Sequence, residues 1–289
     1  MITKMLRRRT ARMTGVIAVL ALSTGVFSAP ASADPGPSYV GLGDSYAAGI
    51  GGGPYVAGPA FEGLPPCIQT DAAYSKALGG LNLACAGATT ADVSRMVTAA
   101  ANDPGMARTV KHASHITVTV GGNDIDAAGA TAQCAALVST PECDAAIINS
   151  IAVKLPQLPA KIKAMVAVIK SKAPRAKIIL TGYPRLFTVN NFMTTEQKSM
   201  ATTVNAAADL LNATIAVSAV ANRVGYVSVT QRFTNRGVGS AQPWIVGPRP
   251  VCSATLSCAP EERPADVFHP NEAGHFHGYQ GALEAVLTR

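Results

Sequence analysis

Residues 38–46 read SYVGLGDSY, an apolar run that ends at a Gly-Asp-Ser turn. A short apolar run closed by a turn is typical of a buried parallel strand that leads into a functional loop. The turn places Ser45 at the carboxyl end of this predicted strand, which is where open α/β sheets bind their ligands. Because a serine after a strand is also a common helix cap, the stretch by itself leaves both roles open for Ser45.

Similar short apolar runs recur along the chain, each followed by a turn or a polar cluster. These runs are residues 81–85, 116–120, 177–181 and 224–229. Alanine-rich stretches with apolar residues at three- and four-residue steps lie between them. These stretches are residues 89–99, 104–112 and 194–223. Strands that alternate with helices predict a parallel sheet covered on both faces, which is an α/β fold.

Three further segments have patterns of their own. Residues 144–172 keep helical spacing through two prolines, which predicts one bent helix or two helices that share an apolar stripe. Residues 50–70 and 231–265 have no periodicity and are predicted to be long loops, which in compact domains usually carry function. No repeat or linker divides residues 34–289, so we expect a single domain there.

The first 33 residues have the composition of an export signal. Basic residues precede an apolar run at residues 15–27, and Ala31-Ser32-Ala33 satisfies the small-residue rule for signal-peptide cleavage. We therefore expect residues 1–33 to be removed and the mature protein, starting near Asp34, to be secreted. Arg7-Arg8-Arg9 lacks the following apolar residue of a twin-arginine signal, which favours the general secretion route.

The basic charge of the chain belongs mostly to this leader. The sequence has 24 basic and 17 acidic residues, a formal charge of +7, but five of the basic residues and none of the acidic ones lie in the leader. The remainder is nearly neutral and has no cluster of Lys or Arg, which argues against nucleic-acid binding. No later run approaches the roughly 20 apolar residues of a membrane span, so we expect no transmembrane segment.

The sequence contains six cysteines, and an even number in an exported chain is typical of a disulfide framework. Many pairings are possible in principle, and neighbours along the chain form three natural pairs. The pairs are Cys67–Cys85, Cys134–Cys143 and Cys252–Cys258. A zinc site is disfavoured because no two cysteines have the two-residue spacing of a zinc knuckle.

A histidine near the C-terminus is a candidate general base. His269 lies in the stretch DVFHPN, and an imidazole of near-neutral pKa is suited to accept a serine proton. Asp266, three residues earlier, could reach the Nδ1 atom and stabilise the imidazolium, as in a serine triad. The alternative role for Asp266 is to cap the helix predicted to start at Pro270.

Two more predicted strand ends carry candidate oxyanion donors. Asn123 follows two glycines after the strand HITVTV and could direct its side-chain amide at an oxyanion. Gly87 could bring a backbone N–H close to a substrate because it has no Cβ. Alternatively, Asn123 would only occupy the left-handed position of a glycine turn.

Taken in order, the blocks GDSY, AGAT, GGND and DVFHPN resemble those of the SGNH, or GDSL-type, hydrolase family over roughly residues 38–287. The size and the three neighbouring cysteine pairs resemble the family's secreted actinomycete esterases and lipases. The resemblance implies a flavodoxin-like three-layer α/β/α sandwich with five parallel strands. Tyr46 departs from the leucine of the family's name.

The resemblance also implies roles for the residues of the four blocks. Ser45 would be the nucleophile, His269 its base and Asp266 the partner of that base. Ser45, Gly87 and Asn123 would form the oxyanion hole. In some members of this branch a backbone carbonyl replaces the acid, which leaves the role of Asp266 open. Two-step acyl transfer of this kind needs no metal or organic cofactor.

Other interpretations fit less well. An α/β-hydrolase would need Gly-x-Ser-x-Gly around its nucleophile, whereas Ser45 is followed by Tyr46-Ala47. A secreted binding module without catalysis would have lost a block residue, and all four are present. A metal site of His275 and His277 with Asp266 is disfavoured because residues two apart on a helix point in different directions.

The expected substrate is a small-molecule or lipid ester. Apolar residues of the two long loops would form an acyl-chain pocket, namely Ile50, Tyr55, Phe61, Leu64, Phe233, Trp244 and Ile245. Deacetylation of a polysaccharide is the second candidate, and the low aromatic content argues against it. We expect a monomer, although no residue pattern sets the oligomeric state or the preferred chain length.

Overall fold

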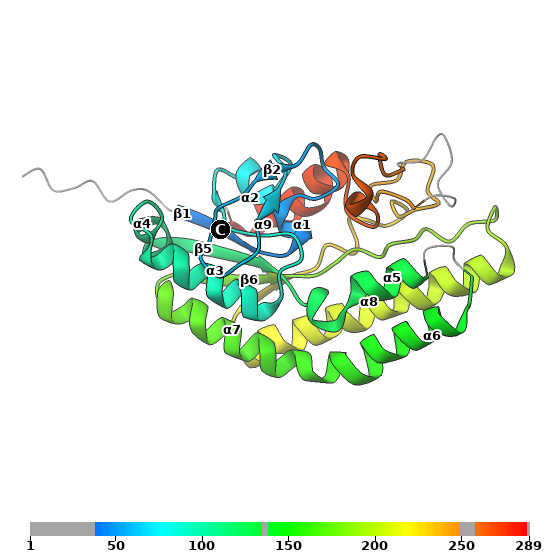
Figure 1. Ribbon diagram of the computed structural model, residues 1–289, viewed down its shortest axis with the longest axis horizontal. Coiled ribbons are helices and arrows are strands. Elements are labelled where there is room, and N and C mark those ends of the chain that lie inside the picture. The colour runs from blue at the N-terminus through cyan, green and yellow to red at the C-terminus, as the bar shows by residue number, and fades with distance from the viewer. Residues whose placement is uncertain (1–37, 135–137, 249–257, 288–289) are drawn as a thin grey trace, which may run out of the picture. The chain divides into compact units, whose positions relative to one another are not determined.

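A five-stranded parallel sheet in the order β4-β1-β5-β6-β7 runs through the computed structural model (Figure 1). Its strands are β1 (Ser38–Gly43), β4 (Leu81–Asn82), β5 (Ala113–Thr119), β6 (Lys177–Thr181) and β7 (Gly225–Val227). The structure describes residues 38–134, 138–248 and 258–287. Gly43 is the register partner of Thr119, so the carboxyl ends of β1 and β5 lie side by side.

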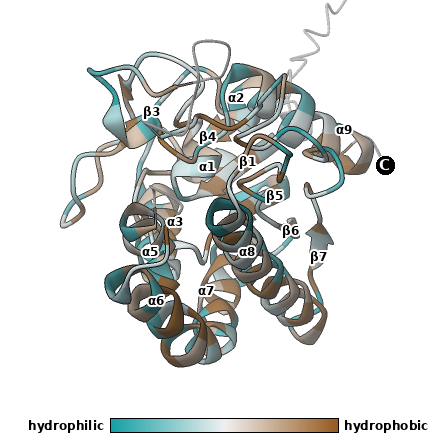
Figure 2. Ribbon diagram, turned by 90° about the vertical axis from the view of Figure 1, so that its right-hand side faces the viewer, coloured by the Kyte–Doolittle hydropathy of each residue, from teal (hydrophilic) through white to brown (hydrophobic). Residues whose placement is uncertain are grey.

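Helices cover both faces of this sheet (Figures 1 and 2). One face carries α3 (Thr90–Asn102), α7 (Leu158–Lys172) and α8 (Thr195–Ala221), and the short α4 (Ala107–Lys111) leads into β5. The other face carries α1 (Ser45–Ala48), α2 (Tyr74–Ala77) and the C-terminal η5 (Gly274–Gln280) and α9 (Gly281–Leu287). The prediction of an α/β/α sandwich around a five-stranded parallel sheet is confirmed.

Apolar side chains form two buried clusters. The first fills the space between the sheet and helices α3 and α7, and it includes Leu42, Val97, Ile116, Ile162 and Ile169. The second includes Ala47, Tyr74, Phe233, Tyr279 and Leu283. The sheet therefore separates two cores, and the loops at its carboxyl edge are anchored in both.

The segment with two prolines contains two helices joined by irregular turns. These elements are α6 (Pro141–Ile148), the π-helical turn η2 (Asn149–Lys154), the 3₁₀ turn η3 (Leu155–Gln157) and α7. Pro159 lies in the first turn of α7, where a missing N–H removes no helical hydrogen bond. The sequence predicts one bent helix or two helices in this segment, and the structure has a helical run without a break from Pro141 to Lys172, with irregular turns between α6 and α7.

Helix α8 corrects the expectation that no run after the leader approaches the length and apolar composition of a membrane span. It has 27 residues and is, within the described residues, the one helix long and apolar enough to cross a membrane by length and composition alone. In the structure α8 packs against α7, β6 and β7. Its residues Val204, Leu211 and Ile215 are buried, whereas Leu210, Val217 and Val220 are exposed.

Disulfides fix two segments near the carboxyl edge of the sheet. Part of the predicted loop 50–70 forms an antiparallel ribbon of β2 (Val56–Ala57) and β3 (Ile68–Gln69). The Cys67–Cys85 disulfide joins this ribbon to the segment after β4, and Cys134–Cys143 joins the end of α5 (Ala127–Gln133) to α6. Two of the three predicted disulfides are therefore present. Cys252 and the predicted leader, residues 1–33, lie outside the described residues, so the third pair and the leader remain predictions.

Candidate active site

Ser45 stands where β1 turns into α1. Gly43 has a φ of +135°, and a Cβ there would collide with the carbonyl oxygen of Thr119. Only glycine therefore fits at this position, where the end of β1 lies against β5. The next residue, Asp44, caps α1 by accepting a hydrogen bond from the Tyr46 N–H at 3.0 Å. Ser45 is thereby the first residue of a helix that starts directly at the sheet edge.

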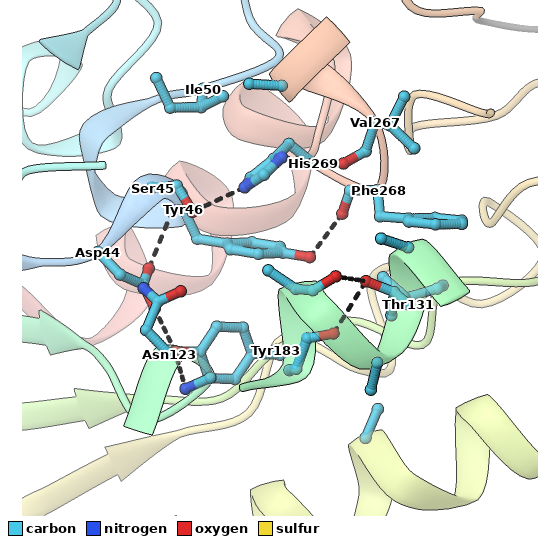
Figure 3. Close-up of a pocket in the computed structure, with 18 of the residues that line it drawn as sticks. Asp44, Ser45, Tyr46, Ile50, Asn123, Thr131, Tyr183, Val267, Phe268 and His269 are labelled. Atoms are coloured by element: carbon cyan, nitrogen blue, oxygen red, sulfur yellow. Dashed lines mark hydrogen bonds between the residues drawn. The ribbon is translucent and has the colours of Figure 1, made fainter. Parts of the chain in front are cut away.

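The structure brings His269 to this serine (Figure 3). Its Nε2 atom lies 2.7 Å from the Ser45 Oγ, across 224 residues of sequence. The chain on either side of His269 is held by Val246, which accepts a hydrogen bond from the Phe268 N–H at 2.9 Å and donates one to the His269 carbonyl at 2.9 Å. Ser45 and His269 therefore have the spacing of a nucleophile and its base.

Burial sets the charge of this imidazole. It lowers the pKa of His269 to about 4, and the hydrogen bond with the Val267 carbonyl opposes this shift. A neutral imidazole has one nitrogen free to accept a proton. At neutral pH the ring can therefore take the proton of Ser45.

The predicted contact between Asp266 and His269 is not made. The His269 Nδ1 atom instead lies 3.1 Å from the carbonyl oxygen of Val267. Asp266, 1% exposed, accepts hydrogen bonds at 2.9 Å from the Tyr55 hydroxyl and at 2.9 Å from the Arg263 Nε. The buried carboxylate turns to these two donors because a charge removed from water needs partners.

The capping role weighed for Asp266 is also not observed. The side chain of Asn271 accepts a hydrogen bond from the Gly274 N–H at 3.0 Å, at the start of the C-terminal helical segment. The two sequence-based roles for Asp266 are thus filled by the Val267 carbonyl and by Asn271.

The two candidate oxyanion donors lie beside Ser45 on one cavity. Asn123 begins the 3₁₀ turn η1 (Asn123–Ile125), and its Nδ2 donates to the Ala88 carbonyl at 3.0 Å, which leaves one amide hydrogen. Gly87 has a φ of +81°, and no atom lies within 4 Å of a Cβ built on it, so the side of its Cα where a side chain would stand is open. Asn123 itself does not have a positive φ, which excludes the left-handed turn as its role.

Small and apolar side chains line this cavity, whose volume is about 670 Å³. Ser45 and His269 lie on its wall, and nearly half of the remaining wall comes from α5, η2, α8 and the residues that follow β6. Wall residues from these helices include Ala128, Thr131, Ile151, Ala207, Ala208 and Leu211. This size and lining suit a small apolar ligand or one acyl chain.

The cavity corrects the predicted pocket. Of the seven apolar loop residues, only Ile50 and Tyr55 line it. Phe61 and Leu64 pack into the first core cluster, and the others pack into the second. The loops therefore use most of these large side chains as core residues, and the cavity wall combines residues of the helices with a few residues of the loops.

Comparison with known proteins agrees with this arrangement. The sequence profile of the GDSL-like Lipase/Acylhydrolase family matches residues 42–276. The chain belongs to this family. This GDSL-like lipase/acylhydrolase is accordingly a carboxylic-ester hydrolase, and the family predicted from the four blocks is confirmed.

Relatives of this GDSL-like enzyme include two lipases of Streptomyces species. A lipase of Streptomyces rimosus is 28% identical, over 97% of this chain and 99% of that protein. Lipase 1 of Streptomyces coelicolor is 26% identical, over 96% of this chain and 99% of that protein.

Two crystal structures are similar to the fold. The extracellular lipase of S. rimosus superposes with a TM-score of 0.68 at 27% identity, over 86% of this chain and 99% of that one. The phospholipase A1 of Streptomyces albidoflavus superposes with a TM-score of 0.66 at 27% identity, over 86% and 98% of the two chains.

Tyr183 is a site residue of this GDSL-like enzyme that sequence reasoning missed. Its hydroxyl donates to the buried Asp44 carboxylate and accepts a hydrogen bond from the Gly122 N–H at 3.1 Å. Burial raises the pKa of Asp44 to about 7, and the hydrogen bond from Tyr183 opposes this shift. The tyrosine thus joins the turn of Ser45 to the turn of Asn123. The position of Tyr183 just after β6 is the sequence feature that could have identified it.

The histidines after His269 have structural contacts. His275 is buried, and its Nε2 lies 2.9 Å from the Ile50 carbonyl, while His277 stacks on Trp244. Within residues 38–134, 138–248 and 258–287, no group of three His, Cys, Asp or Glu side chains could hold a metal ion.

Proposed function

We propose that this GDSL-like enzyme hydrolyses fatty-acyl and other apolar carboxylic esters through an acyl-enzyme on Ser45, with His269 as general base. One observation carries the proposal: the 2.7 Å hydrogen bond between Ser45 Oγ and His269 Nε2 lies at the wall of an apolar cavity of about 670 Å³. A serine paired with a neutral imidazole is the arrangement that activates a hydroxyl for attack on a carbonyl.

In the first step, the Ser45 Oγ forms a bond to the ester carbonyl carbon while its proton passes to His269 Nε2. The carbonyl oxygen becomes an oxyanion, and the N–H groups of Ser45 and Gly87 with the Asn123 amide stabilise it. His269 then donates the proton to the departing alcohol as the ester C–O bond breaks. In the second step, His269 takes a proton from water, the hydroxide attacks the acyl carbon, and Ser45 leaves as a hydroxyl.

The carbonyl of Val267 takes the orienting role in this proposal. It accepts a hydrogen bond from the Nδ1–H of His269, 3.1 Å away, which fixes the tautomer whose Nε2 is free to accept the serine proton. Asp266 is assigned no part in proton transfer, because its carboxylate is engaged by Tyr55 and Arg263.

The cavity supports an acyl chain as the group that it receives. Each CH₂ group removed from water contributes about 0.8 kcal/mol, so an apolar wall favours a longer acyl chain until the space is full. Polysaccharide deacetylation, the second candidate from the sequence, would leave this wall unused, since an acetyl group is too small to fill it.

Secretion is part of the proposal. It is supported by the leader-like residues 1–33, by two disulfides in the described residues, and by the extracellular lipase of S. rimosus among the similar structures. Disulfides of this kind persist in oxidising compartments.

The test is hydrolysis of p-nitrophenyl esters from acetate to palmitate by the oxidised protein, with Ser45→Ala and His269→Ala measured alongside. We expect both variants to lose about 10⁴-fold or more in kcat. Retention of kcat within a few-fold of wild type in either variant would overturn the mechanism. Activity on acetate that does not rise with chain length would overturn the assignment of the cavity to acyl chains.

A further inference from the structure

Tyr46, which stands where the family's name has leucine, makes a contact that leucine could not make. Its hydroxyl donates a hydrogen bond to the carbonyl oxygen of Phe268 at 2.5 Å (Figure 3). Phe268 directly precedes His269 in the chain. The residue after the nucleophile therefore holds the residue before the base.

The main chain at Phe268 needs such a contact. Phe268 has a φ of +62°, a left-handed conformation that bulky residues rarely adopt, because the Cβ then approaches the following carbonyl. Strained residues of this kind persist only where their surroundings fix them. On one side the N–H of Phe268 is bound to Val246, and on the other side its carbonyl is bound to Tyr46.

The ring of Tyr46 also contacts both sides of the site. It packs edge-on against Tyr183, with ring centroids 5.0 Å apart, and its centroid lies 5.0 Å from that of His269. Asp44 accepts a hydrogen bond from the Tyr46 N–H, so the backbone of Tyr46 is fixed by the same carboxylate that binds Tyr183. The backbone and ring of Tyr46 are therefore fixed, and with them the position of its hydroxyl.

We propose that Tyr46 is a positioning residue: its hydroxyl holds the strained turn at Phe268 and so sets the hydrogen bond between His269 and Ser45. This role rests on the proposed function, in which His269 is the base. Tyr46 has no part in proton transfer, and it acts only through the place of the imidazole.

The test replaces the hydroxyl alone, with Tyr46→Phe. We expect kcat for p-nitrophenyl butyrate to fall about tenfold with KM changed less than twofold, because misplacing a catalytic group costs rate and not binding. The rate at which a phosphonofluoridate modifies Ser45 should fall by the same factor, since that reaction also needs His269.

Tyr39→Phe is the matched control. Tyr39 is a buried tyrosine of β1 whose hydroxyl pairs with the Thr117 Oγ1 at 2.7 Å, away from the site. We expect it to lower the thermal unfolding midpoint at least as much as Tyr46→Phe does and to leave kcat within twofold of wild type. A kcat of Tyr46→Phe within twofold of wild type, or an equal loss in Tyr39→Phe, would overturn the positioning role.

A second variant tests the strain directly. Asparagine adopts the left-handed conformation more readily than phenylalanine. In a Phe268→Asn background the Tyr46 hydroxyl therefore has less backbone strain to offset. Adding Tyr46→Phe to that background should lower kcat less than twofold. An undiminished tenfold loss would overturn the link through Phe268. Activity retained by Ser45→Ala would instead overturn the proposed function itself, so the two failures are distinguishable.

Discussion

The site has two halves that are built differently. The strand-end half consists of Ser45, Gly87 and Asn123, each of which follows a strand of one parallel sheet. The outer half consists of residues 264–269 and the cavity walls of α5 and α8, which are placed by contacts between distant segments such as Phe268 with Val246 and Asp266 with Tyr55. In the strand-end half, the sheet determines where each residue lies. In the outer half, individual main-chain and side-chain contacts determine where each residue lies.

After substitution of Ser45 or His269 themselves, the largest effect should come from the strand-end half, through the proposed oxyanion donor Asn123. Asn123→Ala removes a preorganised donor from the developing charge, and we expect kcat to fall about 10²–10³-fold. KM should change little, because the ground-state carbonyl binds the amide weakly. Steady-state kinetics on one ester measures both quantities. A loss below tenfold would mean that the amide does not face the oxyanion.

A substitution in the cavity wall should change selectivity and leave the chemistry intact. Ala208 of α8 lines the cavity, and Ala208→Phe should lower kcat/KM for palmitate at least about tenfold while acetate stays within twofold. The control is Ala206→Phe, an exposed position on the same helix outside the cavity wall. Equal losses on both esters, or in both variants, would show that the acyl chain lies elsewhere.

Asp266 tests whether residues of the outer half have the roles that the sequence suggests for them. A triad acid costs about 10⁴-fold in kcat when it is neutralised. Here the carboxylate binds Tyr55 and Arg263, so Asp266→Asn should lower kcat less than about fivefold while the loss of its hydrogen bonds lowers the unfolding midpoint. Kinetics and thermal unfolding of the one variant decide the matter. A loss of 10³-fold or more would restore Asp266 as the partner of His269.

The smallest expected effect is the change of kcat/KM with pH. His269 must be neutral to act, and burial lowers its pKa from 6.5 to about 4. Since the neutral fraction falls only as the pH drops through the pKa, kcat/KM at pH 5.5 should stay close to its value at pH 7.5. An unshifted imidazole would retain about a tenth of its neutral form at pH 5.5. An acid limb centred near pH 6.5 would contradict the shift.

The sequence predicted the strand-end half because parallel strands bring their carboxyl ends to one edge whatever the side chains do. Finding Ser45, Gly87 and Asn123 after three predicted strands therefore predicts that they share one edge of the sheet, whereas their roles are implied by the resemblance to the SGNH family. The sequence did not predict the contact of Asp266 with Tyr55, because Tyr55 lies 211 residues away and no local pattern marks the pair.

The cavity was missed for a related reason. Alanines such as Ala128 and Ala207 form part of its wall, and a space left by small side chains has no signal in the sequence. Large apolar residues such as Phe61 and Ile245 suggested a pocket, but the same residues also suit a core, and packing placed them there.

The Cys67–Cys85 disulfide affects the site as well as the stability of the fold. Cys85 lies two residues before Gly87, and the Ala86 N–H between them bonds to the Ile68 carbonyl beside Cys67 at 3.2 Å. The covalent link thus holds the peptide that presents a proposed oxyanion donor. Reduced enzyme should fold with this donor loosely placed, and activity would then mature only after oxidation.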